Sequence, residues 1–410
     1  MSTYPRVAFL PDTFFEVNGV AHTARQLESF ARRRQIPFLS VHCGPQTQKT
    51  NDGAVLILQL KRSPACISLD ANLDYDPLLW RHATRVAREA RNFGAELIHV
   101  TGPGDMGAVG AYVSWLLKLP LVISWHTSLH EYAGVRLQRL LCFAGKGPSR
   151  FAGYLAQKLS LEVLRCFYRR AAVTMAPNQE LVDLTRSLTC RPAYLMRCGV
   201  DTQLFNPARR TRSGDVFRIG YVGRLTPEKN VRFLAKLGLA LRSKGHNNFE
   251  FVVVGEGSEA DWLRTNVPNV TLTGVLRGDA LTEAYANMDV FAFPSHTDTF
   301  GNVILEALAS AVPAVVTDSG GPKFLIQPGI NGYVAANDEE FIDSVEKILI
   351  DPTLHANMRQ AALAYASLQS WDAVFESVFR TYGESVRLYA AAHPSFASLL
   401  SSRVNGRGCP

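Results

Sequence analysis

The sequence predicts an α/β protein with two doubly wound, Rossmann-like domains that face each other across a cleft, and three observations indicate this. Short apolar segments alternate with amphipathic ones along the chain, which is the pattern of parallel sheets covered by helices. The 410 residues exceed one ordinary core and suit two domains of roughly 150–200 residues each. A composition of 47% hydrophobic and 19% charged residues is typical of a globular protein. Ligands of such sheets bind at the carboxyl ends of the strands, so we expect the cleft to hold the site.

The first half of the chain is expected to form the N-terminal domain, over residues 1–205. A polar run at 206–215 breaks the alternation of apolar segments and marks the linker to the second domain. The apolar segments of this half predict strands at 6–11, 36–42, 54–60, 96–101, 119–125, 171–176 and 193–198.

The second half is expected to form the C-terminal domain, over residues 206–370. A helix at 371–392 is expected to return to the first domain, and residues 393–410, which are rich in Ser, Gly and Arg, to form a disordered tail. The apolar segments predict strands at 217–223, 249–254, 269–273, 290–294 and 314–317, with a weaker one at 331–335.

The cysteines and the start of the chain indicate a cytoplasmic protein. Seven cysteines are scattered, odd in number and without a C-x-x-C pair, which favours reduced thiols and argues against a zinc site. Residues 1–5 lead directly into a strand-like run without the features of a signal peptide. No uninterrupted apolar segment of 18 residues occurs, so we expect no segment to span a membrane.

The most informative stretch of the sequence places two carboxylates around a helix start. Asp298 and Glu306 lie eight residues apart, and an apolar run follows Gly301 and Asn302. If the helix begins there, the N–H groups of its first turn, including that of Val303, form an anion site. Glu306 then lies one turn inside, and its side chain tilts back toward the helix start. A carboxylate beside a bound phosphate is suited to accept hydrogen bonds from sugar hydroxyls, so the pattern indicates a nucleotide sugar.

A second motif places two cations at a strand end. Gly223 and Arg224 follow the strand predicted at 217–223, and Thr226 with Pro227 is a plausible helix start. Lys229 would then lie in the first helical turn, where a cation is unfavourable unless an anion such as a diphosphate is bound nearby. A solvated basic turn is the alternative interpretation.

Two weaker signals come from the first half. Gly19 begins the helix expected at 20–34 and lets the backbone approach a ligand closely, although a plain turn is the alternative. His126 ends a predicted strand and could orient a hydroxyl or carry a proton, although a structural histidine is the alternative. The G-x-G-x-x-G sequence at 102–107 is interpreted as a tight turn, because the next strand does not end in the acidic residue of a dinucleotide site.

Taken together, these residues resemble the retaining glycosyltransferases of family 4, which have the GT-B fold. The carboxylate pair resembles the E-x7-E motif of that family, and it combines with Gly-Arg-x-x-x-x-Lys and a strand-end His. The resemblance implies an acceptor-side first domain and a second domain that binds the nucleotide sugar. It also implies a catalytic group of His126, Arg224, Lys229 and Asp298, and a donor-binding group of Gly19, Gly223, Gly301, Asn302, Val303 and Glu306.

The resemblance also implies roles for these residues. Arg224 and Lys229 would neutralise the leaving diphosphate, and the acceptor hydroxyl would attack on the face that the nucleotide leaves, with the departing phosphate as base. His126 would lie beside the transferred sugar, Glu306 at the ribose and Asp298 toward the hexose. No D-x-D sequence occurs in the strands expected to face the cleft, so we expect no metal and no other cofactor.

Two departures from the family pattern concern the same region. Asp298 is one methylene shorter than the usual Glu, and Phe324 stands where relatives commonly have Glu after a Gly-Gly pair. A same-fold alternative is therefore a catalytically weak protein that only binds nucleotide sugars. The donor is expected to be GDP- or UDP-linked, and residues 299–303 resemble members that use GDP-mannose, which favours mannose as the hexose.

The positive charge of the chain raises two questions about partners. A net charge of +7 and a pI near 9.0 suggest nucleic-acid binding, but no helix-turn-helix, RNP or finger pattern occurs, so we expect no nucleic acid. Residues 136–170 hold eight cations against one acid, Glu162, among many apolar residues. Such a segment can lie on an anionic membrane, which predicts peripheral association and a lipid or lipid-linked acceptor. A helix packed on the first domain with a solvated basic face is the alternative.

Overall fold

The computed structural model divides the chain into two compact units. It describes residues 4–16, 18–70, 73–126, 146–298 and 300–405. Unit 1 comprises Met1–Arg197 together with Phe375–Pro410, and unit 2 comprises Cys198–Val374. The first unit ends eight residues before the boundary expected at 205, and the chain returns to it from Phe375.

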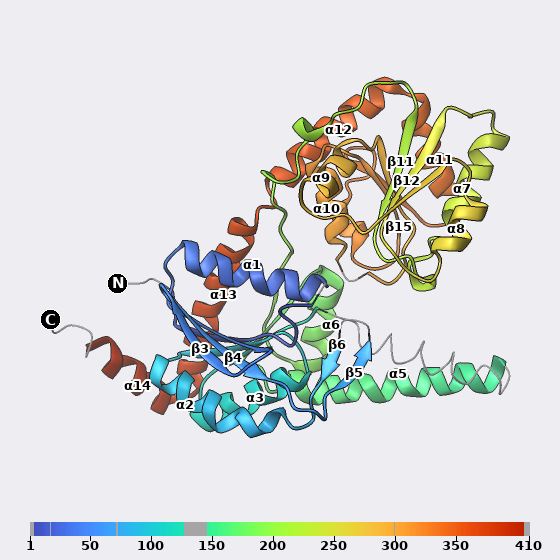
Figure 1. The fold of residues 1–410 in the computed structure, drawn as a ribbon. Helices are drawn as coiled ribbons and strands as arrows, with labels where there is room; N and C mark the ends of the chain where they lie inside the picture. The colour runs from blue at the N-terminus through green and yellow to red at the C-terminus, as the bar shows by residue number, and fades with distance from the viewer. Residues whose placement is uncertain (1–3, 17, 71–72, 127–145, 299, 406–410) are drawn as a thin grey trace. The chain divides into compact units, whose positions relative to one another are not determined.

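Unit 1 is built on an eight-stranded sheet in the order β10-β9-β8-β7-β1-β2-β4-β3 (Figure 1). All neighbouring strands are parallel except β3 and β4. The central strands are fully buried, as expected for a parallel sheet covered on both faces. The strands are β1 (Val7–Leu10), β2 (Phe38–Gly44), β3 (Gln48–Asp52), β4 (Val55–Lys61), β7 (Leu97–Val100), β8 (Leu121–Ser124), β9 (Val173–Ala176) and β10 (Ala193–Leu195); a separate hairpin holds β5 (Ile67–Asp70) and β6 (Leu73–Tyr75).

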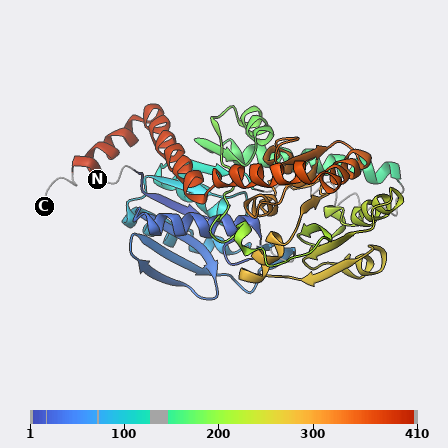
Figure 2. The same cartoon turned by 90° about the horizontal axis from the view of Figure 1, so that it is seen from above.

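The helices of unit 1 cover this sheet (Figure 1) (Figure 2). Those from the N-terminal part are α1 (Gly19–Arg33), α2 (Ala83–Phe93), α3 (Asp105–Leu117), α5 (Lys146–Tyr168) and α6 (Gln179–Thr189); the C-terminal ones are α13 (Trp371–Ala392) and α14 (Pro394–Asn405). Helix α13 starts in unit 2 and lies in unit 1 from Phe375 onward. There its aromatic side chains join the core: Phe375 and Phe379 pack against Phe30 of α1, and Phe379 also reaches Phe38 of β2.

Unit 2 has a six-stranded, fully parallel sheet in the order β13-β12-β11-β14-β15-β16. Its strands are β11 (Phe217–Val222), β12 (Phe249–Val254), β13 (Val270–Gly274), β14 (Val290–Phe293), β15 (Ala314–Thr317) and β16 (Gly332–Ala335). Its helices are α7 (Phe233–Ser243), α8 (Ala260–Asn266), α9 (Gly278–Ala286), α10 (Asn302–Ala309), α11 (Asp338–Ile350) and α12 (Pro352–Ser367), with 3-10 turns η3 (Pro207–Arg209), η4 (Pro227–Lys229) and η5 (Pro322–Leu325).

The two sheets, one fully parallel and the other parallel except for β3, confirm the predicted α/β class, and every predicted strand is present within a few residues. Three strands were not predicted. The five residues of β3 are all exposed and polar, so this edge strand has no apolar pattern. Strands β5 and β6 form a short hairpin of their own, outside both large sheets.

The expectation of a disordered tail from residue 393 is wrong for residues 394–405, which form α14. Pro394 suits the first position of a helix, and Phe396 is only 5% exposed because it packs edge-on against Tyr389 of α13. Burial of this ring anchors a segment whose composition alone is typical of a frayed end. Residues 406–410 lie outside the described part of the chain.

Candidate functional site

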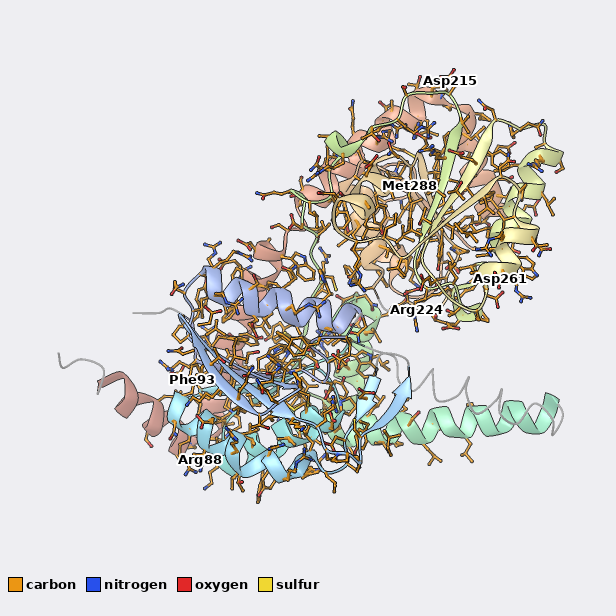
Figure 3. All side chains as sticks on the ribbon, in the orientation of Figure 1. Arg88, Phe93, Asp215, Arg224, Asp261 and Met288 are labelled. Atoms are coloured by element: carbon orange, nitrogen blue, oxygen red, sulfur yellow. The ribbon has the colours of Figure 1, made fainter. Side chains whose placement is uncertain are left out.

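Eight of the ten predicted site residues belong to unit 2, and they follow two neighbouring strands. Gly223, Arg224 and Lys229 come after β11, whereas Asp298 and the first turn of α10 come after β14. Strands β11 and β14 pair in parallel, so their carboxyl ends share one edge of the sheet. Figure 3 shows Arg224 at the opposite end of this sheet from Asp215, which precedes β11. The other two residues, Gly19 and His126, belong to unit 1.

The turn after β11 is held by its own backbone. The Gly223 N–H donates to the Val254 carbonyl at 3.0 Å, and the Tyr221 hydroxyl donates to the Arg224 carbonyl at 3.1 Å. The Arg224 side chain is 49% exposed and lies 4.0 Å from Glu228. It is therefore available to an anion at the strand end.

Lys229 lies in a different local structure from the one expected. It ends the 3-10 turn η4, and the α-helix starts only at Phe233. Pro227 opens the turn as predicted, but the Thr226 side chain does not cap it, and its Oγ1 is buried without a hydrogen-bond partner among the described residues. The short turn leaves Lys229 only 8% exposed and directs its ammonium group toward the β14 side of the site.

The structure brings Lys229 and Asp298 together. Lys229 Nζ donates to Asp298 Oδ1 at 2.6 Å, while Asp298 Oδ2 is buried and has no partner among the described residues. The Asp298 carbonyl accepts from the Gly321 N–H at 2.7 Å. Gly320 makes this approach possible, because its φ is +71° and a Cβ there would lie 2.4 Å from the Asp298 oxygen. The Gly-Gly pair thus supports Asp298, and Phe324, in η5, is 40% exposed.

Helix α10 begins where the sequence predicts. Gly301 occupies the N-cap position with a φ of +91°, and the helix runs from Asn302. The N–H groups of Asn302 and Val303 have no acceptor within the helix, as for any helix start. Asn302 Oδ1 is also buried without a partner among the described residues. These polar groups come four and five residues after Asp298 in the chain.

Glu306 lies one turn into α10 and has a partner that sequence reasoning missed. The hydroxyl of Tyr285, from α9, donates to Glu306 Oε2 at 2.7 Å. Burial raises the pKa of Glu306, and the bond from Tyr285 opposes this rise. Tyr285 is fully buried, and a buried tyrosine hydroxyl requires a hydrogen-bond partner, which is the signal that could have drawn attention to it.

In unit 1, His126 follows β8 by two residues. Its Nε2 lies 2.8 Å from Ser124 Oγ, and burial lowers its pKa to about 4, so the ring is neutral at pH 7. Gly19 is the exposed first residue of α1, whose start is capped by Asn18. The Asn18 side chain accepts from the Ala21 N–H at 2.8 Å. Both residues thus lie at element ends, as expected.

The G-x-G-x-x-G loop is filled by a carboxylate of the chain itself. Asp12, just after β1, accepts from the N–H groups of Gly104 at 3.2 Å and Gly107 at 2.9 Å. Burial raises the pKa of Asp12 to about 6. Because Asp12 occupies the anion position of this loop, the structure agrees with its interpretation as a tight turn.

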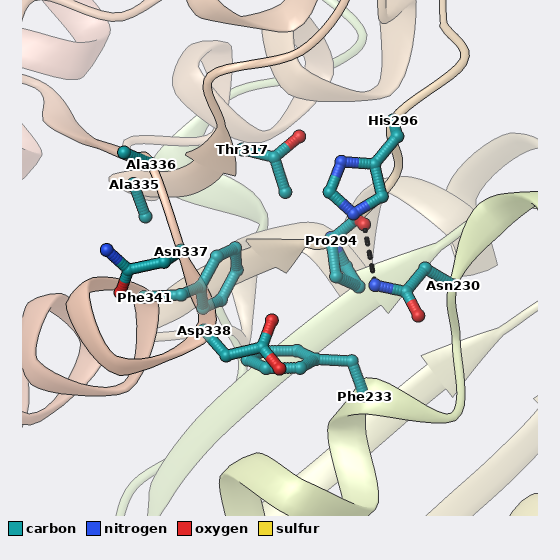
Figure 4. A pocket seen from close by; sticks show the side chains of 10 residues that line it. All are labelled: Asn230, Phe233, Pro294, His296, Thr317, Ala335, Ala336, Asn337, Asp338 and Phe341. Atoms are coloured by element: carbon teal, nitrogen blue, oxygen red, sulfur yellow. Dashed lines mark hydrogen bonds between the residues drawn. The ribbon is translucent and has the colours of Figure 1, made fainter.

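A small pocket lies beside the site, at the carboxyl ends of β14, β15 and β16 (Figure 4). The Asn230 side chain, next to Lys229 in sequence, lines it and donates to the Pro294 carbonyl at 3.3 Å. Lys229, Asp298 and Glu306 do not line this pocket, so it does not coincide with the predicted site. Its lining consists of Asn230, Phe233, Pro294, His296, Thr317, Ala335, Ala336, Asn337, Asp338 and Phe341.

Two family models match the chain, one in each half. The model described as Glycosyltransferase Family 4 matches residues 17–204. The model described as Glycosyl transferases group 1 matches residues 216–351, which contain the Lys229–Asp298 pair and Glu306.

Curated relatives align over most of the chain. A GDP-mannose-dependent alpha-mannosyltransferase of Corynebacterium glutamicum is 27% identical over 395 residues, which cover 93% of this chain and 90% of that protein. A protein of the same name from Mycobacterium tuberculosis is 28% identical over 401 residues, covering 93% and 97%. The capsular polysaccharide biosynthesis glycosyltransferase CapM of Staphylococcus aureus is 32% identical over 303 residues, covering 69% and 76%.

Solved structures share the fold. A sucrose-phosphate synthase from Thermosynechococcus elongatus superposes with a TM-score of 0.70 at 18% identity, covering 94% of this chain and all of that one. Anabaena HepE in complex with UDP superposes with a TM-score of 0.67 at 19% identity, covering 92% of this chain and all of that one. The architecture is therefore that of the GT-B glycosyltransferases.

Proposed function

The chain belongs to glycosyltransferase family 4, and from this membership we propose that it transfers mannose from GDP-mannose to an acceptor hydroxyl with retention of configuration. The observation that carries the choice of donor is the alignment, over 93% of this chain, with relatives named GDP-mannose-dependent alpha-mannosyltransferases. The site in unit 2 supports a nucleotide sugar because it combines cations, a helix start and a carboxylate suited to hydroxyls.

Some of these residues stabilise the charge that develops during transfer, and others position the donor. The bond between the anomeric carbon and the diphosphate oxygen breaks while the acceptor oxygen bonds to the same face of that carbon, and the leaving phosphate takes the acceptor proton. Negative charge grows on the diphosphate, where Arg224, Lys229 and the start of α10 stabilise it. Glu306 accepts hydrogen bonds from the ribose hydroxyls.

The two carboxylate oxygens of Asp298 have different roles. Oδ1 fixes the Lys229 ammonium at 2.6 Å, and Oδ2, buried and unpartnered among the described residues, accepts from a hydroxyl of the hexose. A buried oxygen without a partner is costly, so a ligand hydroxyl that satisfies it adds to affinity. The shorter side chain of Asp298 is thus compatible with the donor role of the usual Glu.

A thermal-shift comparison with GDP-mannose, GDP, UDP-glucose and UDP tests the donor. GDP-mannose should raise Tm most, because a ligand that binds only the folded state stabilises it. Turnover of GDP-mannose, in hydrolysis or transfer, separates an enzyme from a protein that only binds the donor, with the Glu306→Ala variant as inactive control. Stabilisation by UDP-sugars alone would refute the choice of donor, and stabilisation without turnover would favour the weak binder.

Transfer should not require a divalent metal, because Arg224 and Lys229 supply fixed charge where a metal would otherwise offset the diphosphate. We expect the rate in excess EDTA to equal the rate in buffer alone. A loss of rate that Mg²⁺ or Mn²⁺ restores would contradict this.

For the acceptor we propose a lipid or lipid-linked sugar at an anionic membrane surface. Figure 1 shows α5 extending beyond the sheet of unit 1. This helix exposes apolar side chains: Tyr154 is 55% exposed, Leu155 47%, Leu159 61% and Val163 67%. The exposed Lys158, Arg169 and Arg170 lie on the same helix or just after it. No helix in the described ranges is both long and apolar enough to cross a membrane.

Exposure of these apolar residues favours membrane contact over packing on the domain. Sedimentation with vesicles of anionic and of neutral lipid tests it, since each cation near an anionic surface adds about 1 kcal/mol. The Lys158→Gln, Arg169→Gln double variant should lose binding. The Arg242→Gln, Arg264→Gln double variant of unit 2, with equal charge loss, should keep it. Equal sedimentation with both lipids, or with neither, would favour a soluble acceptor.

A further inference from the structure

The outer face of helix α3 in unit 1 is apolar, although it faces water. The only charged residue of this helix is Asp105, at its first position, and that carboxylate is buried and paired with Arg62. The inner face of α3 packs on the core through residues such as Val113. On the outer face Trp115 is 72% exposed and Leu116 41%. A helix that is apolar on all sides is typical of an element covered on all sides, so the outer face of α3 indicates a contact with another apolar surface.

An aromatic side chain from a neighbouring turn extends this face. Trp80 of the 3-10 turn η1 (Leu79–His82) is 47% exposed and lies edge-on to Tyr112 of α3, with 5.5 Å between the ring centroids. The ring of Tyr112 in turn lies 5.8 Å from that of Trp115. These three rings form one connected surface, which is termed the aromatic patch. Contiguous exposed apolar groups of this kind are typical of interaction sites.

Helix α2 packs against α3 and carries a row of arginines on its outer side. Arg85, Arg88 and Arg91 recur every three residues, whereas the buried residues of α2 are small and apolar. Figure 3 shows Arg88 on the side of unit 1 away from α1. Arg88 and Arg91 are exposed and have no acidic partner among the described residues. The one acid of α2, Glu89, is bound by Lys49 at 2.7 Å, so the arginine row stays positively charged.

We propose that the aromatic patch and the arginine row form one surface that binds a membrane of anionic phospholipid. Tryptophan and tyrosine suit the boundary between acyl chains and headgroups, because their rings are apolar but carry one polar group. Guanidinium groups suit the phosphates of the headgroups, to which each can donate two hydrogen bonds. The surface uses no residue of α5 and therefore goes beyond the contact proposed for that helix.

The charge of the surface favours a membrane over a second copy of the chain. A two-fold symmetric dimer brings the same patch of both subunits together. Such a dimer through this surface would place the arginine rows of two copies beside each other, which is unfavourable. An anionic membrane supplies the opposite charge along the whole row, and each cation near it strengthens binding.

The topology of the sheet places this surface on the same side of unit 1 as α5. The connections that lead to β7, β8 and β9 all step in one direction along the sheet, and right-handed crossovers then place α2, α3 and α5 on one face. Figure 1 shows these three helices on the side away from α1. Two contacts on one side act together, since the first to bind holds the second near the membrane. Loss of either contact should therefore weaken binding strongly.

Partitioning of the full chain into vesicles tests the aromatic patch. The wild type should bind phosphatidylglycerol vesicles and not phosphatidylcholine vesicles. The Trp115→Gln, Leu116→Gln double variant should bind about tenfold more weakly or less, because it loses apolar contact with lipid. The matched control is Leu239→Gln, Leu368→Gln in unit 2, whose side chains are 61% and 75% exposed, and it should bind like the wild type. Unweakened binding of the Trp115 variant, or a wild type that binds neither lipid, would overturn the proposal.

The same measurement tests the arginine row. The Arg88→Gln, Arg91→Gln double variant should bind phosphatidylglycerol vesicles about fivefold more weakly for each charge removed. The Arg242→Gln, Arg264→Gln double variant of unit 2 removes the same charge and should bind like the wild type. Equal weakening in both double variants would mean that only the net charge matters, which would overturn the assignment to α2.

Tryptophan fluorescence tests whether the patch itself enters the membrane. Lipids with bromine in their acyl chains quench the tryptophans that reach them. Of the five tryptophans, Trp80 and Trp115 belong to the patch, α5 holds none, and Trp262 belongs to unit 2. Quenching on binding should persist in Trp262→Phe and be largely lost in the Trp80→Phe, Trp115→Phe double variant, whose rings remain apolar. Equal quenching in the two would overturn the proposal and leave α5 as the contact.

Further outcomes separate this surface from other partners and from sugar transfer. Self-association of the wild type that Trp115→Gln abolishes, without vesicle binding, would identify the patch as an interface between copies and overturn the membrane surface. The vesicle measurements use neither donor nor acceptor. A chain that transfers mannose to a soluble acceptor but binds no vesicle would overturn this surface alone. Binding through the patch without turnover would instead overturn the proposed transfer and leave the surface in place.

Discussion

Among single residues, Glu306 is a carboxyl group whose surroundings disfavour its charged form. Burial raises its pKa, and the hydrogen bond from Tyr285 only partly compensates. A carboxyl group whose pKa is higher in the folded than in the unfolded state binds more protons when folded, so its contribution to stability is lost as pH rises through the folded pKa. The ionised form of Glu306 is therefore less favourable in the folded chain than in water, which is expected of a residue retained for binding.

Glu306→Gln should therefore stabilise the protein and weaken donor binding at the same time. The amide removes the buried charge but keeps an acceptor for Tyr285, so Tm at pH 7.5 should rise. The gain should shrink as pH falls toward 4.5, the ordinary pKa of a glutamate. Donor affinity should fall about tenfold or more, since charge-assisted bonds to hydroxyls are lost. Melting curves across this pH range and donor titrations check both parts, and an unchanged affinity would remove Glu306 from the donor site.

Lys229 should act mainly in the transition state. Lys229→Ala is expected to lower kcat more than it raises KM for the donor, because charge on the leaving diphosphate is greatest as the bond breaks. Steady-state kinetics measure the two effects separately. Asp298→Asn offers a comparison, since it leaves the ammonium in place but removes the anion that holds it. A Lys229→Ala enzyme with wild-type kcat would exclude the proposed role.

At the level of elements, the donor site depends on the close approach of two backbone segments as much as on side chains. The stretch after β15 comes close to the Asp298 backbone, and only glycine fits at position 320. Asp298 is therefore held from two sides, by the Lys229 ammonium and by the Gly321 N–H. Two connections from neighbouring strands thereby hold one residue, the first through its carboxylate and the second through its backbone carbonyl.

Gly320→Ala should lower the free energy of unfolding by more than the left-handed backbone conformation alone accounts for. Gly329 is the matched control, because its φ of +77° resembles the +71° of Gly320 but nothing lies within 4 Å of its added Cβ. Gly329→Ala should lose roughly 1–2 kcal/mol of unfolding free energy from the left-handed conformation. Gly320→Ala should lose more and should also bind the donor less tightly. Denaturant titration and donor binding measure this, and equal effects of the two variants would argue against the close approach.

The sequence predicts those elements and site residues whose pattern is local. Buried parallel strands are apolar runs, and Asp298, Gly301 and Glu306 mark the start of α10 by spacing alone. The exposed strand β3 has no such pattern, and η4 replaces the helical turn expected at Lys229 because the α-helix begins later. Tyr285, which donates to Glu306, and Tyr382, which bonds to His99, each lie on a different element from their partner. Only tertiary packing therefore reveals these two contacts.

At the scale of the whole molecule, the two units differ in how many segments of the chain they contain. Unit 2 is one uninterrupted segment, Cys198–Val374, whereas unit 1 needs both ends of the chain. The core of unit 1 depends on that second piece, because Phe375 and Phe379 of α13 pack on Phe30 of α1. The same piece also brings Tyr382 to His99.

The segment 198–374 expressed alone should fold and bind GDP-mannose, since its sheet is complete and it holds every predicted donor-binding residue except Gly19. The segment 1–197 alone should not form a stable fold, because it leaves the apolar surface that α13 covers exposed to water. Thermal melting followed by circular dichroism distinguishes a cooperative from a non-cooperative transition. A cooperative transition of 1–197 would show that α13 is dispensable for unit 1.

The return of the chain through α13 has a consequence for biosynthesis. The strands of unit 1 are synthesised before unit 2, but the aromatic residues of α13 that close their core are synthesised only after it. Unit 2 has a contiguous sequence and can fold while unit 1 still exposes the surface around Phe30 and Phe38. The strands of unit 1 must therefore remain partly open until α13 has been made, and during that interval they are the part most in need of a chaperone.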